Sequence, residues 1–369
     1  MRPTVANNDY AQTVAASIIK QLEDGTAPWV KPWEPSDQRF IPYNAATGKE
    51  YQGGNALWLM VTAENKGYGD ARWMTYKQAQ GVDAQVMKGE RGTLIQYIKK
   101  FDRVPIENEQ GQPVRDGEGK PMYRTVELDR PRIFSAVVFN AEQISGLPKI
   151  EARATMPVWE RHQAAETIMD NSGVPISYKP NDRAFYSVTH DAVTMPERVQ
   201  FKTPDQFYAT ALHELGHATG HPTRLNRPDL GTPFGSAAYA REELRAEIAS
   251  LMIADRMGIG HDPGQHAAYV GSWIKALKEE PREIFRAAAD AEKIAGYLTD
   301  LQQERKAAVA STTTAATTPT PAAAPGATPE QNYWQRGIES GRSIQAAEAV
   351  SRPQVERQVT KDQATIAGR

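Results

Sequence analysis

The spacing of apolar residues predicts a well-delimited helix over residues 203–220. Apolar side chains recur there at intervals of three and four, the period of a helix that packs one face against a core. Thr203 is a suitable N-cap, Pro204 suits the first helical position, and Gln206 stands where a capping box places an amide side chain. Gly220 is typical of a helix end.

A second helix is predicted over residues 236–258. Ser236 is a suitable N-cap and Gly258 a suitable end. The apolar stripe between them consists of Leu244, Ile248, Leu251 and Met252. Acidic residues lie beside this stripe, so the helix can turn carboxylates toward the element on which it packs.

The first 140 residues predict a mixed α/β arrangement. The expected helices cover residues 9–22, 56–65 and 75–80, and the expected strands cover 94–98 and 131–140. We expect the two strands to pair with one another. Residues 102–130 are polar and contain several glycines, which favours a long hairpin loop between those strands.

The later part of the chain predicts a second α/β segment. Its expected elements are a helix over 158–172, strands over 174–178, 184–188 and 193–201, and a helix over 281–302. Pro196 interrupts the last of these strands, and because proline donates no hydrogen bond it favours a position at the sheet edge. An edge strand directly before the 203–220 helix would let an extended peptide add itself by main-chain pairing.

Composition narrows the classes of protein that fit. The chain has 369 residues, enough for two domains and a tail, and its net charge of -2 offers no global basic field for nucleic acid. The absence of cysteine excludes disulfides, thiolate metal sites and a cysteine nucleophile. No apolar run approaches about 18 residues and the N-terminus lacks the form of a signal peptide. We therefore expect a soluble, cytoplasmic protein without a membrane partner.

The motif His213-Glu214-Leu215-Gly216-His217 carries the clearest chemistry. On a helix, His213 and His217 lie one turn apart on one face, so both imidazoles can reach one metal ion. Glu214 is rotated from them by about 100° and can act on a water bound to that ion. This pattern predicts a zinc hydrolase with Zn²⁺, or another divalent metal, as its cofactor.

The 236–258 helix offers candidates for the third metal ligand. Glu243 and Glu247 lie one turn apart, so one can bind the metal while the other accepts a hydrogen bond from a ligand histidine. We favour Glu243 as the ligand with Glu247 behind it, and Glu242 less. Alternatively, all three could form a solvated face paired with Arg241 and Arg245.

Two residues further along are candidates for contacting the substrate. His266 or Tyr269 could donate a hydrogen bond to an oxyanion in a hydrolase site. A single histidine downstream of a metal motif is, however, more often structural.

The N-terminal segment combines aromatic, amide and basic residues with glycines. Its aromatic and amide candidates are Trp29, Trp33, Asn44, Tyr51, Asn55 and Trp73, and its cationic candidates are Lys31, Lys49, Arg72, Lys88, Arg91, Lys99 and Lys100. Such residues suit a single strand whose bases stack on rings while its phosphates meet cations. The same rings would equally suit a hydrophobic core, and the residues alone leave both interpretations open.

In combination, several motifs resemble those of the ArdC-type antirestriction proteins carried by conjugative plasmids and phages. They are GTAPWVKPW, PYNAATGKEYQGGNALWL, RWMTYKQAQ, KGERGTLIQYIKK, FNAEQISGL, ALHELGHATGHPTRLNR and YAREELRAEIAS. The resemblance places the family's metal motif on His213, Glu214 and His217, and its acidic motif within residues 242–247. It also favours stacking over core packing for the N-terminal aromatics.

The resemblance implies an α+β protein with three parts. They are a mixed α/β single-stranded-DNA-binding domain over 8–148, a zincin-like metallopeptidase domain over 155–303, and a low-complexity linker with a disordered tail over 304–369. The implied function is protection of incoming DNA from host restriction endonucleases. Single-stranded DNA is the expected partner, with subunits of a restriction enzyme or a peptide substrate as further candidates.

An alternative hypothesis assigns the metal site no catalytic role. The zincin-like domain would then be a silent scaffold, and the protein would coat single strands or serve as a primase-associated accessory of DNA transfer.

Overall fold

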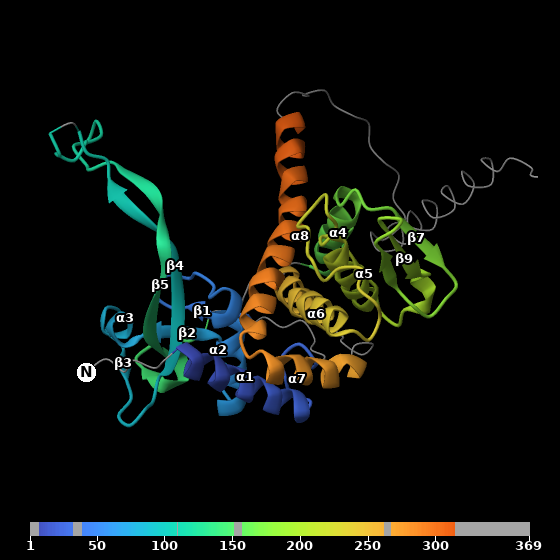
Figure 1. Ribbon diagram of the computed structural model, residues 1–369, viewed down its shortest axis with the longest axis horizontal. Coiled ribbons are helices and arrows are strands. Elements are labelled where there is room, and N and C mark those ends of the chain that lie inside the picture. The colour runs from blue at the N-terminus through green and yellow to red at the C-terminus, as the bar shows by residue number, and fades with distance from the viewer. Residues whose placement is uncertain (1–6, 32–38, 109, 151–156, 262–266, 314–369) are drawn as a thin grey trace, which may run out of the picture. The chain divides into compact units, whose positions relative to one another are not determined.

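The chain has an α+β fold, seen here in a computed structural model that describes residues 7–31, 39–108, 110–150, 157–261 and 267–313 (Figure 1). All of these residues belong to one compact unit, residues 1–316. Trp33, His266 and residues 314–369 of the expected tail lie outside the described residues. Among the described helices, none is long and apolar enough to cross a membrane.

The N-terminal half surrounds a four-stranded sheet. Its elements are α1 (Asn7–Glu23), β1 (Tyr43–Asn44), α2 (Gly53–Lys66), β2 (Arg72–Thr75), α3 (Tyr76–Gln80), β3 (Gln85–Val86), β4 (Thr93–Pro105), β5 (Tyr123–Asn140), the 3-10 helix η1 (Ala141–Gln143) and β6 (Ile144–Ser145). The sheet order is β1-β2-β5-β4, and β3 pairs with β6. The predicted pairing of residues 94–98 with 131–140 is confirmed, since Leu94 lies opposite Val137 and Ile98 opposite Ile133.

The prediction of a loop over residues 102–130 was wrong at both ends. β4 continues to Pro105 and β5 begins at Tyr123, with an irregularity in register between Lys99 and Phe101. Charged residues in these segments hide the alternation of side-chain types that predicts a strand. That alternation is sufficient for a two-stranded ribbon whose two faces are both exposed to solvent. Figure 1 shows the paired strands continuing well past β1 and β2.

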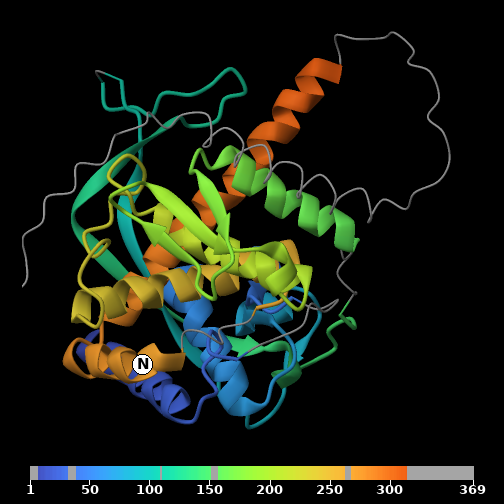
Figure 2. The ribbon, with the colours of Figure 1, turned by 90° about the vertical axis from the view of Figure 1, so that its right-hand side faces the viewer.

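The later half contains a three-stranded sheet and most of the helices. Its elements are α4 (Val158–Asn171), β7 (Ile176–Lys179), β8 (Phe185–Ser187), β9 (Ala192–Pro196), η2 (Arg198–Gln200), α5 (Pro204–Ala218), α6 (Ala237–Met257), η3 (Ala267–Tyr269), α7 (Val270–Glu279) and α8 (Glu283–Thr313). α8 packs against α6 and α4, and both ribbon views show it beside these two helices (Figure 1, Figure 2). It ends beyond residue 303, the predicted limit of the domain.

The predicted edge position of Pro196 was wrong. The sheet order is β7-β9-β8, so β9 is the central strand and β8 lies at an edge. Pro196 is the last residue of β9, opposite Lys179 of β7. A proline at a strand end disturbs few ladder hydrogen bonds, which explains how β9 accommodates it in the middle of the sheet.

The two halves are joined by hydrogen bonds and ion pairs. The carboxylate of Asp255, on α6, accepts hydrogen bonds from the backbone N–H of Phe40 (2.9 Å) and of Ile41 (3.4 Å). Arg256 forms ion pairs with Glu292 of α8 and with Glu50 of the N-terminal half. α8 also packs against α2, where Gly54 leaves room for the ring of Phe285.

Replacing Asp255 by Ala should lower the free energy of unfolding by about 1–3 kcal/mol, because two backbone donors lose a buried acceptor. Equilibrium denaturation measures this. Asp24→Ala, which removes the exposed partner of Lys20, serves as the control and should leave the midpoint unchanged. Equal effects of the two substitutions would show that Asp255 does not hold the halves together.

Candidate metal centre and its cavities

The helix α5 presents the two histidines of the H-E-x-x-H motif on one face. Thr203 caps it as expected, its hydroxyl accepting the N–H of Gln206 at 3.2 Å, and Pro204 occupies the first turn. The rings of His213 and His217 lie 4.8 Å apart between centroids and nearly perpendicular, at 81°. Both side chains are buried.

The helix α6 packs on α5 and supplies the carboxylates. Ser236 caps it by accepting the N–H of Tyr239 at 3.0 Å, and Gly258 ends it with a left-handed backbone at φ 67°. Its three glutamates in question, Glu242, Glu243 and Glu247, are all buried. Their alternative partners point elsewhere, because Arg241 pairs with Asp229 and Arg245 with Glu283. The solvated-face interpretation of these glutamates therefore does not hold.

His213, His217 and Glu243 together form a set of possible metal ligands. One ligand atom from each lies within 4.8 Å of the others. The two Nε2 atoms are 3.2 Å apart, and the carboxylate oxygens of Glu243 lie 3.8 Å from Nε2 of His213 and 3.6 Å from Nε2 of His217. The structure thus brings together the three residues that the sequence singled out as ligands.

Each histidine has a carboxylate behind it. Glu247 Oε2 lies 3.4 Å from Nδ1 of His213, where the sequence had placed it. Glu242 Oε1 lies 3.3 Å from Nδ1 of His217, a role that the sequence did not suggest. Since a carboxylate accepts hydrogen bonds, these positions favour a proton on each Nδ1 and leave each Nε2 lone pair for a metal.

Arg227 holds Glu242 in place and was missed in the sequence. Its Nε lies 3.0 Å from Glu242 Oε2, and its Nη1 donates to the hydroxyl of Thr219 at 2.6 Å. Its Nη2 donates to the carbonyl of Gly216 at 2.9 Å. Burial alone would raise the pKa of Glu242, but hydrogen bonds from His217 and Arg227 lower it to about 2. In the sequence, a basic residue shortly after the H-E-x-x-H motif is only a weak sign of such a role, because many arginines occupy comparable positions.

The charge balance of the cluster suits a cation. Arg227 offsets the charge of Glu242, which leaves the carboxylates of Glu243 and Glu247 beside the two imidazoles. Burial would lower the pKa of His217, yet Glu243 and Glu242 raise it well above its ordinary value. Burial would likewise raise the pKa of Glu243, but the two histidines hold it far below its usual range. These residues therefore fit a divalent cation by both donor type and charge.

The cluster opens into a cavity of about 800 Å³. One wall is β8 with the residues just before it, and the other includes Phe234, Tyr239 and Tyr269. Glu214 lines this cavity together with both histidines. A carboxylate beside a wide, partly apolar space can act as a general base on a bulky substrate.

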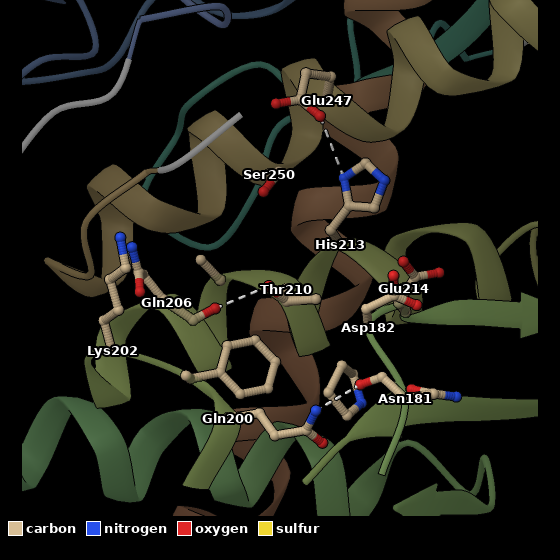
Figure 3. A pocket seen from close by; sticks show the side chains of 13 residues that line it. Asn181, Asp182, Gln200, Lys202, Gln206, Thr210, His213, Glu214, Glu247 and Ser250 are labelled. Atoms are coloured by element: carbon tan, nitrogen blue, oxygen red, sulfur yellow. Dashed lines mark hydrogen bonds and ion pairs between the residues drawn. The ribbon is translucent and has the colours of Figure 1, made fainter. Parts of the chain in front are cut away.

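A second cavity, of about 340 Å³, reaches His213 from another side. Figure 3 shows its lining, with Lys202 and Gln206 at one end and His213, Glu214 and Glu247 at the other. His213 and Glu214 line both cavities, so an extended substrate could reach Glu214 from either side.

Tyr269, one of the two predicted oxyanion donors, lines the larger cavity. Its hydroxyl lies 3.2 Å from that of Tyr239, which is one helical turn before Glu243. Burial raises the pKa of both phenols, and Glu243 raises that of Tyr239 further, so both remain protonated donors at neutral pH. Tyr239 was not singled out in the sequence, although its position one turn before Glu243 was a usable signal.

The structure places several of the proposed DNA-contacting residues in the core. Trp29 and Trp73 are both 0% exposed, and Tyr51 packs in one cluster with Trp73. The prediction that bases stack on these rings is therefore wrong, and the alternative, that the rings belong to the hydrophobic core, is correct. A tryptophan in an extended, proline-flanked segment can equally face inward, which the sequence pattern does not distinguish.

Most of the proposed polar contacts have structural partners. The side-chain amide of Asn55 donates to the carbonyl of Gln96, and Asn44 accepts two backbone N–H groups of its own turn. Arg72 pairs with Asp70, and Lys31 pairs with Glu64. The exposed cations among the candidates are Lys49, Lys88 and Arg91, with Lys99 and Lys100 on β4.

Comparison with known families divides the chain into two matched parts. Residues 8–139 match the N-terminal domain of anti-restriction factor ArdC, and residues 163–290 match a zincin-like metallopeptidase domain. Solved structures of the antirestriction ArdC protein from plasmid R388 are also similar. The metal-free form is 35% identical with a TM-score of 0.61 and covers 80% of this chain and 98% of that one. The Mn(II)-bound form is 34% identical with a TM-score of 0.59 and covers 81% and 98%.

Curated relatives include a much longer protein. A DNA primase TraC of Escherichia coli is 54% identical over 297 residues, which cover 80% of this chain but 20% of that protein. A second TraC is 55% identical, and this chain covers 27% of it. The uncharacterized protein y4eC of Sinorhizobium fredii (strain NBRC 101917 / NGR234) is 35% identical, with 80% of this chain and 93% of that one covered.

Replacing Arg227 by Met should lower the free energy of unfolding by about 3–5 kcal/mol, because it leaves the carboxylate of Glu242 buried without its charge partner. Denaturant titration measures this. Adding Glu242→Gln should recover part of the loss, whereas Arg241→Met, at a more exposed pair, should have little effect. If the double variant is no more stable than Arg227→Met alone, the orphaned charge is not the cause.

Proposed function

Because this chain belongs to the ArdC-type antirestriction family, we propose that it is an antirestriction protein with two working parts. One is a metal-dependent peptidase centre at His213, His217 and Glu243. The other is a surface for single-stranded DNA on the N-terminal half. Together they would protect incoming DNA from host restriction endonucleases.

One observation carries the peptidase proposal. Two imidazole Nε2 atoms and one carboxylate converge, at separations of 3.2–3.8 Å, on the wall of a cavity that a fourth side chain, Glu214, also lines. Two histidines and one glutamate are a known ligand set of catalytic zinc, which leaves a further coordination position for water or substrate. Zn²⁺ is therefore the cofactor we propose. Bound there, the ion would supply Lewis acidity, polarising a carbonyl and lowering the pKa of water.

The surrounding residues would each have a separate role in the hydrolysis. Glu214 would take a proton from the attacking water and deliver it to the leaving amine. The paired hydroxyls of Tyr239 and Tyr269 would donate to the oxygen that gains charge when the carbonyl is attacked. Arg227 would act from behind, by keeping Glu242 ionised and in contact with His217.

The edge strand β8 gives a peptide substrate a place to bind. It pairs with β9 on one side only, and residues 182–186 line the larger cavity. An extended peptide could add to β8 through main-chain hydrogen bonds and lie across Glu214. This replaces the edge role first expected of the strand that contains Pro196.

The ribbon formed by β4 and β5 is our proposed surface for single-stranded DNA. Tyr97 and Phe134 lie directly opposite one another and are 44% and 49% exposed. Lys99 and Arg132 form the pair two positions along, hence on the same face. Asp102 lies 2.6 Å from Lys99 and 3.8 Å from Arg132, so the three leave a net positive charge beside the rings. Exposed rings flanked by cations suit stacked bases and their phosphates.

The similarity to TraC supports a second candidate function. Part of a primase shares more than half of its residues with this chain, so a role beside a primase during DNA transfer is the alternative. The chain spans about a fifth to a quarter of those relatives, so their priming activity is not assigned to it.

Glu214→Gln should lower the rate of peptide hydrolysis by about 10²- to 10⁴-fold and leave metal binding intact, because it removes the base but no ligand. Hydrolysis of a peptide library and metal content measure the two effects. Undiminished cleavage by the variant would exclude Glu214 as the base.

The same variant separates the competing functions. Plasmid transfer is compared between restricting and restriction-deficient recipients, with Glu214→Gln beside the parent protein. A peptidase-based mechanism predicts lost protection in the restricting recipients alone. The scaffold hypothesis predicts full protection by the variant, and the primase-accessory hypothesis predicts that deleting the protein lowers transfer into both recipients.

Replacing Tyr97 and Phe134 by Ala should weaken binding of an oligothymidine by about 1–3 kcal/mol for each ring that stacks on a base. Fluorescence anisotropy at several salt concentrations measures the affinity. The matched control replaces Ile98 and Ile133 by Ala, the exposed pair on the opposite face of the ribbon. Equal losses in both double variants, or none in either, would contradict this surface.

A further inference from the structure

The residue His261 connects the metal centre with the N-terminal half. It lies just after α6 and is 3% exposed. Its Nε2 is 3.4 Å from Oε1 of Glu247 and 3.0 Å from the backbone carbonyl oxygen of Trp29. Both of these partners are themselves buried, and Trp29 precedes His261 by 232 residues in the chain.

The chemistry of these partners determines where the proton of the imidazole lies. A carbonyl oxygen and a carboxylate oxygen are both acceptors, so Nε2 of His261 must carry the hydrogen that they share. The carboxylate of Glu247 then accepts from His261 through Oε1, while its Oε2 faces Nδ1 of His213. Because Nδ1 of His213 faces this carboxylate, Nε2 of that ring is left as the ligand atom.

We propose that His261 is a positioning residue for the metal centre: held by the carbonyl of Trp29, it orients Glu247, which in turn orients His213. The inference rests on the metal site proposed above. Its consequence is that metal affinity depends on a backbone position in the N-terminal half, the turn that contains Trp29. The buried Trp29 would then hold His261 through its backbone carbonyl, a role unrelated to base stacking.

The energetic reason is the low tolerance of a buried carboxylate for lost partners. Glu247 is 1% exposed, so a rotation of its side chain away from His213 would not be compensated by water. Loss of a hydrogen-bond partner behind a metal ligand typically lowers metal affinity about 10- to 100-fold. His261 acts through Glu247 and His213, and does not line either cavity.

The test measures Mn²⁺ affinity of the full chain from the electron paramagnetic resonance of the free ion. Four variants are compared with the parent: His261→Leu, His261→Gln, His261→Asn and Glu292→Gln. Gln can place an N–H where Nε2 of His261 lies, whereas Leu has no donor and Asn is too short. Glu292→Gln is the matched control, because it changes a different link between the halves: the Glu292 carboxylate pairs with Arg256 and accepts the backbone N–H of Gly53 at 3.4 Å.

The proposal expects about 10- to 100-fold weaker binding for His261→Leu and His261→Asn, and binding within a few-fold of the parent for His261→Gln and Glu292→Gln. If His261→Leu does not fold, the contrast between Gln and Asn decides the matter. Equal affinity of the parent, Gln and Asn variants would overturn the positioning role.

One further variant separates this failure from failure of the metal site itself. His213→Ala should abolish Mn²⁺ binding by the full chain. If it binds as well as the parent, or the parent binds no ion, the proposed metal centre is wrong. If His213→Ala loses the ion while all His261 variants keep parent affinity, only the positioning role is wrong.

Discussion

Two imidazole nitrogens that face one another at 3.2 Å, in a buried region supplied with carboxylates, are the constraint around which the later half of the protein is built. Such an arrangement is unfavourable unless positive charge lies between or on the rings, so the region favours a cation. The surrounding fold supplies the means of holding it. α5 fixes the spacing of His213 and His217, and α6 places Glu243 in front of them, with Glu242 and Glu247 behind.

Buried charge in this region is balanced by specific partners. Arg227 reaches from the loop after α5 to Glu242, and it also donates to backbone carbonyls at the end of that helix. On the other side, His261 reaches Glu247 and the N-terminal half. Each histidine of the motif thus has its own series of contacts behind it: those of His217 stay within the later half, and those of His213 reach the N-terminal half. The two halves are therefore joined beside His213 as well as through α8.

Much of this could be read from the sequence, because helix signals and the metal motif are local. Thr203, Ser236 and Gly258 act as caps as predicted, and the helices that they delimit bring His213, His217 and Glu243 together. Contacts set by tertiary packing could not be read in this way. Nothing local distinguishes a buried Trp29 from an exposed one, or tells that β9 is central despite Pro196. The support from Arg227 and His261 depends on loops whose paths only the fold determines.

The central claim is that His213, His217 and Glu243 bind one divalent ion. Anomalous diffraction from crystals grown with Zn²⁺ or Mn²⁺, recorded at the absorption edge of the metal, tests it most directly. The account predicts one strong anomalous peak per chain, within bonding distance of both Nε2 atoms and of a carboxylate oxygen of Glu243. A peak coordinated by Glu242 or Glu247 in place of Glu243, or no peak near the two histidines, would contradict it.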